Sequence, residues 1–126
     1  MEKKYLWCSV HTPTKEQLIS LEKMGELVYL KDVNPILQER INNCSSDATE
    51  LLEVAISLGT YQTKHEYTLV QIGGSPMFLF MCGSTVKRSE VMFSYSVRDS
   101  IDVPQEDGTV IKTSVFKHIK WIKSIF

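Results

Sequence analysis

Three short segments of the sequence carry groups that could act on a ligand, and each follows a run of residues typical of a β-strand. Residues 9–14 supply hydroxyls and one imidazole, residues 73–76 supply glycine backbone and a hydroxyl, and residues 96–100 supply a guanidinium. Backbone amides near glycine, hydroxyls and guanidinium groups are what proteins use to bind phosphate. The sequence therefore predicts one phosphate-binding site built from Ser9, His11, Thr12, Gly73, Gly74, Ser75, Ser96 and Arg98.

Two of these residues are the candidates for catalysis. Arg98, with the amides around Gly74, would bind the phosphate. His11 would act as a general acid or base, because an imidazole titrates near neutral pH. Each also has an ordinary structural interpretation. Arg98 could form only a surface ion pair with Asp99, and His11 could be a solvated loop residue. The glycines could form a plain turn, since the chain has neither a P-loop nor a G-x-G-x-x-G motif.

The other two histidines are weaker candidates. His118 lies among lysines in a stretch without acidic residues from residue 108 onward. Such a stretch is typical of the solvent face of an edge strand or a helix. His65 lies in a polar segment and is expected to be inert.

Composition and motifs exclude several classes of function. The three cysteines, at positions 8, 44 and 82, are too far apart for a zinc site or a disulfide framework. No Ser/His/Asp motif, carboxylate pair or metal-ligand cluster occurs, so we expect no metal and no cofactor. With 14 basic and 15 acidic side chains, the formal charge of −1 disfavours non-specific binding of DNA or RNA. No apolar stretch could span a bilayer, so we expect no membrane partner and a cytoplasmic protein with reduced thiols.

The elements that position these segments alternate between strand and helix. Strands are predicted over residues 5–10, 26–31, 67–72 and 91–97. Helices are predicted over residues 15–24, 36–43 and 48–58. A capping box of Thr14 and Gln17 begins the first helix, Gly59 is expected to end the third, and residues 59–66 read as a polar loop. Alternation of this kind predicts a mainly parallel sheet whose strands are joined by right-handed crossovers.

The segment at residues 77–82 is ambiguous. It could be the second strand of a hairpin that turns at Gly73-Gly74, or a buried helix that begins at Pro76. We favour the helix, because a strand at residues 91–97 needs a crossover before it. The turn at Asp107-Gly108 predicts an antiparallel hairpin near the C-terminus.

The expected architecture is a single α/β domain over residues 1–126, a Rossmann-like three-layer fold. A length of 126 residues with 43% apolar side chains is sufficient for one core of this kind. Residues 1–100 would form the parallel α/β core, and residues 101–126 would form a C-terminal β-hairpin extension.

Four motifs in order along the chain resemble a known family. They are Ser-Val-His-Thr-Pro-Thr-Lys-Glu-Gln, Tyr-Thr-Leu-Val-Gln-Ile-Gly-Gly-Ser, Phe-Ser-Tyr-Ser-Val-Arg and Asp-Gly-Thr-Val-Ile-Lys-Thr-Ser-Val-Phe-Lys-His-Ile-Lys-Trp. Together the chain resembles the small stand-alone CRISPR-associated Rossmann-fold (CARF-like) ring nucleases of type III CRISPR systems.

The resemblance implies a homodimer that binds the second messenger cyclic tetra-adenylate and cleaves it, which switches off antiviral signalling. Such ring nucleases act without metal, through attack of a ribose 2′-hydroxyl on its adjacent phosphate, and give linear products with a 2′,3′-cyclic phosphate. The residues at positions 9–12, 73–75 and 96–98 would line the ring. The alternatives are a non-catalytic cyclic-nucleotide sensor or sponge, a protein-interaction module, and an unrelated small-molecule enzyme.

Overall fold

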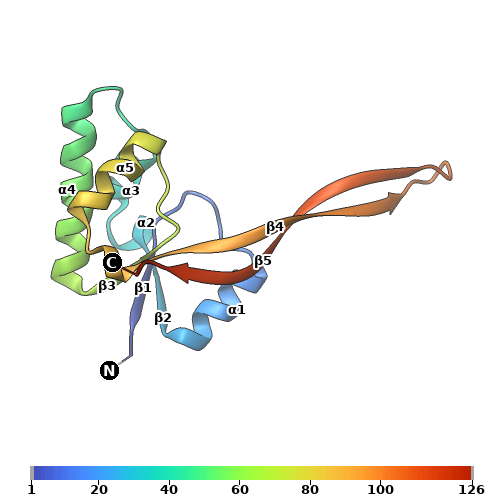
Figure 1. Cartoon of the computed structure of the whole chain (residues 1–126), viewed down its shortest axis with the longest axis horizontal. Coiled ribbons are helices and arrows are strands. Elements are labelled where there is room, and N and C mark those ends of the chain that lie inside the picture. The colour runs from blue at the N-terminus through green and yellow to red at the C-terminus, as the bar shows by residue number, and fades with distance from the viewer. Residues whose placement is uncertain (1, 126) are drawn as a thin grey trace.

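Five strands form one mixed sheet in the computed structural model, which describes residues 2–125 (Figure 1). The strands are β1 Lys4–Trp7, β2 Glu26–Tyr29, β3 Tyr67–Val70, β4 Val91–Pro104 and β5 Val110–Lys123. Their order across the sheet is β2-β1-β3-β4-β5. The first four are parallel, and β5 is antiparallel to β4. This confirms the α/β class with a mainly parallel sheet and an antiparallel C-terminal hairpin, whereas Met1 and Phe126, the ends of the expected domain, lie outside the described residues.

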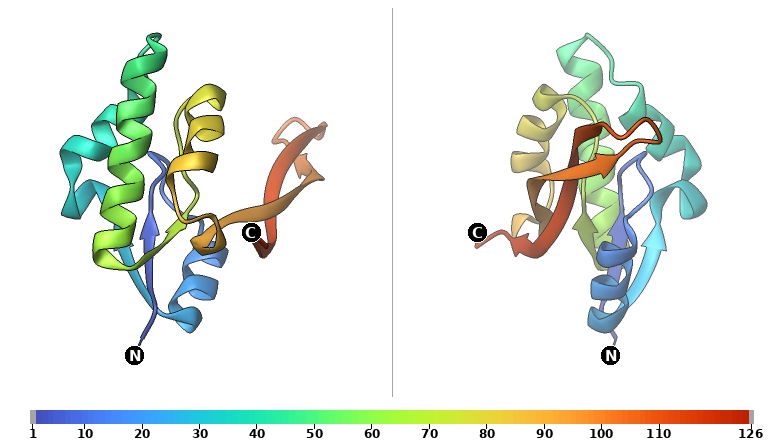
Figure 2. Two further views of the ribbon diagram at one scale, coloured as in Figure 1. Left: turned by 60° about the vertical axis from the view of Figure 1, so that its left-hand side comes forward. Right: turned by 90° about the vertical axis from the view of Figure 1, so that its right-hand side faces the viewer.

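Helices cover both faces of the sheet, which gives three layers (Figure 2). They are α1 Lys15–Met24, α2 Leu30–Val33, α3 Pro35–Asn42, α4 Ala48–His65 and α5 Pro76–Thr85, with a 3-10 turn at Arg88–Glu90. One core packs α3, α4 and α5 against residues such as Leu6 and Leu69. A second, smaller core joins Leu21 of α1 to Trp7 and Met92 on the other face. Two separate cores on a sheet of this type are what a doubly wound fold requires.

Side-chain caps begin α1 and α5 where the sequence predicts. The Thr14 hydroxyl accepts a hydrogen bond from the Gln17 amide, and the Gln17 side chain accepts one from the Thr14 amide, so the predicted capping box is present. Ser75 caps α5 and Pro76 is its first residue. Residues 77–82 are therefore helical and not the strand of a hairpin. This helix is apolar all round, which is why its sequence reads equally well as a buried strand.

The prediction that Gly59 ends a helix is wrong, because α4 continues through it to His65. Residues 59–66 are therefore almost entirely helical and not a loop. A side chain at Gly59 would place its Cβ 2.0 Å from the carbonyl oxygen of Thr85 in α5. The glycine is needed for the close approach of two helices and has no role as a helix stop.

The prediction that the fourth strand ends at residue 97 is also wrong. β4 runs without a break over Val91–Pro104, so residues 96–100 belong to a strand. Its pairing with β5 extends from Met92 with Lys123 to Pro104 with Val110, interrupted by a bulge next to Tyr95 and Ser96. Beyond the sheet these two strands form a long twisted two-stranded arm, which we call the ribbon (Figure 1). The predicted Asp107-Gly108 turn closes its tip, and Gly108 has a φ of 85°.

A polar network closes the amino-terminal edge of the sheet. The carboxylate of Glu90 accepts a hydrogen bond from Thr68 at 2.6 Å and forms ion pairs with Lys3 at 3.1 Å and Lys123 at 3.3 Å. The buried Gln62 side chain bonds the backbone of residues 87 and 90. These contacts tie β1, β3, β4 and β5 together at the edge opposite the predicted site. Among the residues described, no helix has both the length and the apolar character needed to cross a membrane.

Candidate functional site

The predicted ligand segments lie around the point where the strand order reverses. Chain connections run from β1 to β2 on one side and continue at β3 on the other, so the carboxyl ends of β1 and β3 form a topological switch point. The amide of Gly73 donates to the carbonyl of Cys8 at 3.2 Å, and the Gln38 side chain donates to the same carbonyl at 3.1 Å. The loops after β1 and β3 are therefore adjacent, as the parallel sheet predicts.

The loop after β1 is held by its own backbone and by Trp7. The amide of His11 donates to the Ser9 hydroxyl at 3.1 Å, and the Trp7 indole donates to the carbonyl of His11 at 2.8 Å. The side chains of His11 and Thr12 are exposed. Hydrogen bonds to the main chain of His11 thus hold the loop, and the His11 imidazole is exposed to solvent or to a ligand.

A lysine that the sequence analysis did not select lies beside this loop. Lys31 follows β2, its ammonium lies 5.5 Å from the centre of the Tyr29 ring, and both residues line a small hollow with Ser9 and His11. A cation at this position could neutralise a phosphate. Lys31 follows the carboxyl end of a parallel strand, and ligands bind at that end in sheets of this type. Its position in the sequence was therefore the signal that could have identified it.

The glycine turn after β3 has a structural role that accounts for much of its sequence. Gly74 has a φ of 95°, and a Cβ there would lie 2.8 Å from the Phe78 ring. The amide of Ser75 donates to the Cys44 sulfur at 3.3 Å, and the Ser75 hydroxyl accepts from the Phe78 amide at 3.3 Å. The hydroxyl and amide of Ser75 are therefore occupied within the chain, and the turn would offer a ligand its backbone at Gly73 and Gly74.

Arg98 lies on the ribbon and not in a loop. Its guanidinium carbon is 5.1 Å from the centre of the Phe116 ring, directly across from it in the strand register. Neighbouring strand residues point to opposite faces, so Asp99 lies on the other side of the ribbon and the surface ion pair considered for Arg98 does not form. Arg98 shares a face with Ser96 and His118. These two residues form the next pair on that face, two residues closer to the body of the sheet.

A serine–histidine cluster at the base of the ribbon was missed by the sequence analysis. The Ser94 hydroxyl lies 2.5 Å from Nδ1 of His118 and 2.8 Å from the Ser96 hydroxyl. The Gln71 side chain, which directly follows β3, accepts from the Ser94 amide at 2.5 Å. Trp121 packs beside the imidazole with ring centres 4.8 Å apart. Only the pairing of β4 with β5 brings these residues together, so no local pattern in the sequence could have revealed the cluster.

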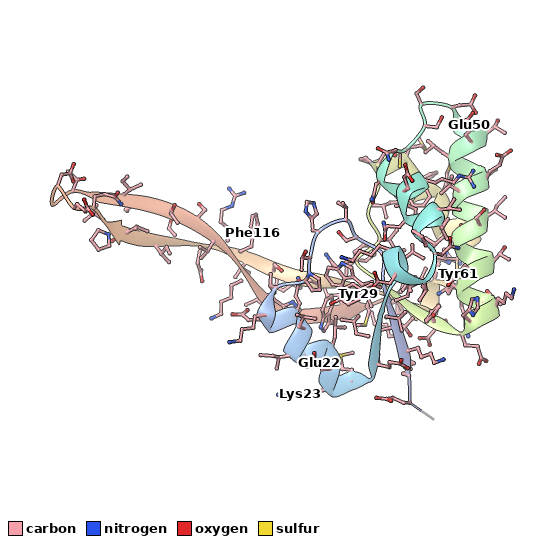
Figure 3. All side chains as sticks on the ribbon, turned by 180° about the vertical axis from the view of Figure 1, so that it is seen from behind. Glu22, Lys23, Tyr29, Glu50, Tyr61 and Phe116 are labelled. Atoms are coloured by element: carbon pink, nitrogen blue, oxygen red, sulfur yellow. The ribbon has the colours of Figure 1, made fainter. Side chains whose placement is uncertain are left out.

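The structure thus brings the predicted residues into two groups within one chain. Ser9, His11, Thr12, Gly73 and Gly74 belong to the adjacent loops after β1 and β3, whereas Ser96 and Arg98 belong to the ribbon. Figure 3 shows Tyr29 below the loop after β1 and Phe116 on the ribbon.

The thiols near this edge are poor nucleophiles. Burial raises the pKa of Cys8 far above its usual range, and burial also raises the pKa of Cys82 to about 12. A protonated thiol neither attacks nor binds metal. Residues 2–125 contain no group of three or more His, Cys, Asp or Glu side chains that could hold a metal ion. The chemistry available at the edge comes from imidazoles, hydroxyls, cations and backbone amides.

The model of the Uncharacterized protein MJ1673 family matches residues 3–122 of the chain, which is nearly its whole length. Neither the curated proteins nor the solved structures contain a match to the chain. The family description names no activity.

Proposed function

We propose that this chain, which belongs to the Uncharacterized protein MJ1673 family, binds cyclic tetra-adenylate and cleaves it as a metal-independent ring nuclease. The role would be to remove a second messenger of type III CRISPR signalling and so to end an antiviral response. The observation that carries the proposal is the switch point between β1 and β3, where two ligand loops are joined by the bond from Gly73 to Cys8. In open α/β sheets this position is the usual site for nucleotide-type ligands.

The groups at this edge suit a cyclic nucleotide. Backbone amides near Gly73 and Gly74 and the cations Arg98 and Lys31 are phosphate-binding groups. The ring of Phe116, next to the Arg98 guanidinium, offers a flat apolar surface on which a base could stack. Cyclic tetra-adenylate is larger than the single set of loops that one chain offers, so we propose that a homodimer shares the ring.

The reaction needs no external nucleophile. The oxygen of a ribose 2′-hydroxyl bonds to the adjacent phosphorus, the bond from phosphorus to the 5′-oxygen breaks, and a 2′,3′-cyclic phosphate and a 5′-hydroxyl result. A base takes the proton of the 2′-hydroxyl, and an acid gives one to the departing 5′-oxygen. His11 is our candidate for this proton transfer, and His118, held by Ser94, is a second imidazole at the same edge. Arg98 would bind the phosphate as its negative charge grows.

Incubation of the pure protein with labelled cyclic oligoadenylates in EDTA tests the enzyme directly. The expected result is linear adenylate with a 2′,3′-cyclic phosphate end, formed at an unchanged rate when divalent cations are removed. Absence of product at stoichiometric protein would refute cleavage.

Single substitutions separate binding from turnover. Arg98→Ala should weaken binding by about 1.5–3 kcal/mol, the value of charged hydrogen bonds, whereas Arg40→Ala on α3 should leave it unchanged. His11→Ala should lower turnover by about 10²–10⁴-fold with little loss of affinity. His65→Ala, at the opposite edge of the sheet, is the matched control. Calorimetry gives the affinities, and unchanged binding by Arg98→Ala would remove that residue from the site.

A non-catalytic sensor or sponge is the second candidate. It is favoured because several groups that could act on a ligand are occupied or unreactive. Ser75 caps a helix, and burial raises the pKa values of the Cys8 and Cys82 thiols. Tight binding with intact ligand recovered after long incubation would support this function, and product formation would exclude it.

A further inference from the structure

We propose that one apolar face of the ribbon, continued by an apolar groove and by α5, docks against a second copy of this chain. We call the ribbon part the apolar ribbon face, made of Val97, Asp99, Ile101, Val103, Ile111, Thr113, Val115 and Lys117. The inference goes beyond the proposed function, because it concerns a different contact between two copies, on the side of the ribbon away from Arg98, and needs no ligand.

The strand register places these residues on one side of the ribbon. Directly paired residues on antiparallel strands point to the same side, and successive residues alternate. The pairs on the apolar side are Val97 with Lys117, Asp99 with Val115, Ile101 with Thr113 and Val103 with Ile111. The pairs on the other side are Ser96 with His118, Arg98 with Phe116, Ser100 with Ser114 and Asp102 with Lys112. The ribbon is therefore amphipathic, although neither side rests on the body of its own chain.

The apolar ribbon face is open to solvent. Ile101 is 43% exposed, Ile111 54% and Val115 38%. Figure 1 shows the two strands projecting away from the helices, with no third strand or helix beside them. A two-stranded ribbon alone is marginally stable in water, and an exposed apolar stripe of this length marks an interaction site.

The same side of β4 leads back to an apolar surface on the body. Phe93 and Tyr95, which share the side of Val97 by alternation, are 38% and 46% exposed. Phe93 also lines an apolar groove of about 380 Å³ together with Ile72 and Leu79. Leu79 belongs to α5, and the same helix exposes Phe80 at 80%. The apolar side of the ribbon thus leads into the groove through Phe93.

The charges on the apolar ribbon face itself fit a second copy better than another occupant. The apolar ribbon face carries one acid, Asp99, and one base, Lys117, and neither has an ion-pair partner within residues 2–125. In a two-fold symmetric dimer every contact between the copies occurs twice, so Asp99 of each copy can pair with Lys117 of the other. A lipid surface would favour a uniformly basic face instead.

The size of the ribbon face indicates which other parts of the surface a dimer must use. From Phe93 to Val103 the strand extends about 33 Å at ~3.3 Å per residue, and the two strands are about 10 Å wide. The strip of ribbon alone covers about 330 Å², so the groove and the neighbouring surface of α5 have to supply the rest of the roughly 800 Å² per partner of a stable interface. Arg98 and His118 lie on the opposite side of the ribbon, so this contact leaves them open to a ligand and is separate from the contact by which two copies would share a cyclic ligand.

Sedimentation velocity of the full chain without ligand tests the inference. The wild-type chain of 14.4 kDa should sediment as a dimer at micromolar concentration. Val103→Lys should raise the dimer dissociation constant at least tenfold, because it puts a charge into the apolar contact. Ser100→Lys, at a neighbouring position on the other side of the ribbon, should leave the dimer intact. Both substituted positions are exposed, so the circular dichroism of both variants should match that of wild type.

Charge exchange provides the specific test of the two-fold pairing. Asp99→Lys alone and Lys117→Asp alone should each weaken the dimer about three- to tenfold, and the double variant should recover most of the loss. A wild-type chain that stays monomeric at 100-fold higher concentration, or a Ser100→Lys variant that dissociates as readily as Val103→Lys, would overturn the inference. Since no oligoadenylate is present, neither result bears on cleavage.

Discussion

Replacement of Glu90 by glutamine should destabilise the protein at neutral pH and lose its effect in acid. The carboxylate accepts a hydrogen bond from Thr68 and pairs with the ammonium groups of Lys3 and Lys123. Partial burial raises the pKa of Glu90, but these three partners together lower it from 4.5 to about 2. The folded state therefore favours the ionised carboxylate more strongly than the unfolded chain does.

The size and pH range of the effect follow from this shift. Each pKa unit corresponds to about 1.4 kcal/mol, so the shift amounts to roughly 3 kcal/mol, and we expect about 2 kcal/mol because both lysines are well exposed. A lowered pKa in the folded state stabilises the protein above the unfolded value of 4.5, and this contribution disappears as the pH falls through about 2. The loss should therefore occur between about pH 5 and pH 2.

Urea denaturation of wild type and Glu90→Gln at pH 7, 5 and 3 measures the difference in the free energy of unfolding. The difference should be about 2 kcal/mol at pH 7 and should shrink markedly by pH 3. Glu22→Gln, on the exposed surface of α1, is the control and should change stability little at all three pH values. Equal destabilisation by Glu90→Gln at pH 7 and pH 3 would refute the electrostatic reasoning, and no destabilisation at pH 7 would refute the assigned partners.

Three further predictions concern the parts of the fold that hold the site. Gly59→Ala should lower the free energy of unfolding by about 1–3 kcal/mol, because its Cβ would meet the Thr85 carbonyl, and thermal unfolding measures this; unchanged stability would contradict the close packing of α4 and α5. Gln62→Ala should cost about 3 kcal/mol in urea denaturation, since it removes the hydrogen bonds to the backbone of residues 87 and 90, and a loss below about 1 kcal/mol would show that water replaces them. Iodoacetamide should modify the half-exposed Cys44 before the buried Cys8 and Cys82, as peptide mass spectrometry would show, and early labelling of Cys8 would contradict its burial.

Local signals predicted the elements whose ends are set by one or two side chains. The Thr14–Gln17 capping box marks the start of α1, and the Ser75-Pro76 pair marks the start of α5. These signals worked because a cap satisfies backbone groups within a few residues, whatever the rest of the chain does. The glycine at position 59 misled the prediction, because the close packing that requires it comes from α5, 26 residues further along the chain.

The candidate site divides in the same way. The loops at residues 9–12 and 73–75 could be predicted, because in a parallel sheet the carboxyl ends of strands converge and the sequence showed which segments follow strands. Lys31 also follows the carboxyl end of a parallel strand, but it was not predicted as a site residue. The grouping of Ser94, Ser96 and His118 could not be predicted, because it depends on the register of β4 with β5 and on the bulge beside Tyr95 and Ser96.

The sequence by itself determined the α/β class, the helix caps and the Asp107-Gly108 turn, since all three depend on periodicity or on contacts between near neighbours in the chain. Tertiary structure alone decided that α4 continues past Gly59, that β4 and β5 run on as one ribbon, and that Arg98 lies over Phe116 on that ribbon. Each of these outcomes is set by packing or pairing between residues distant in sequence, and such contacts leave no periodic signal in either segment taken alone.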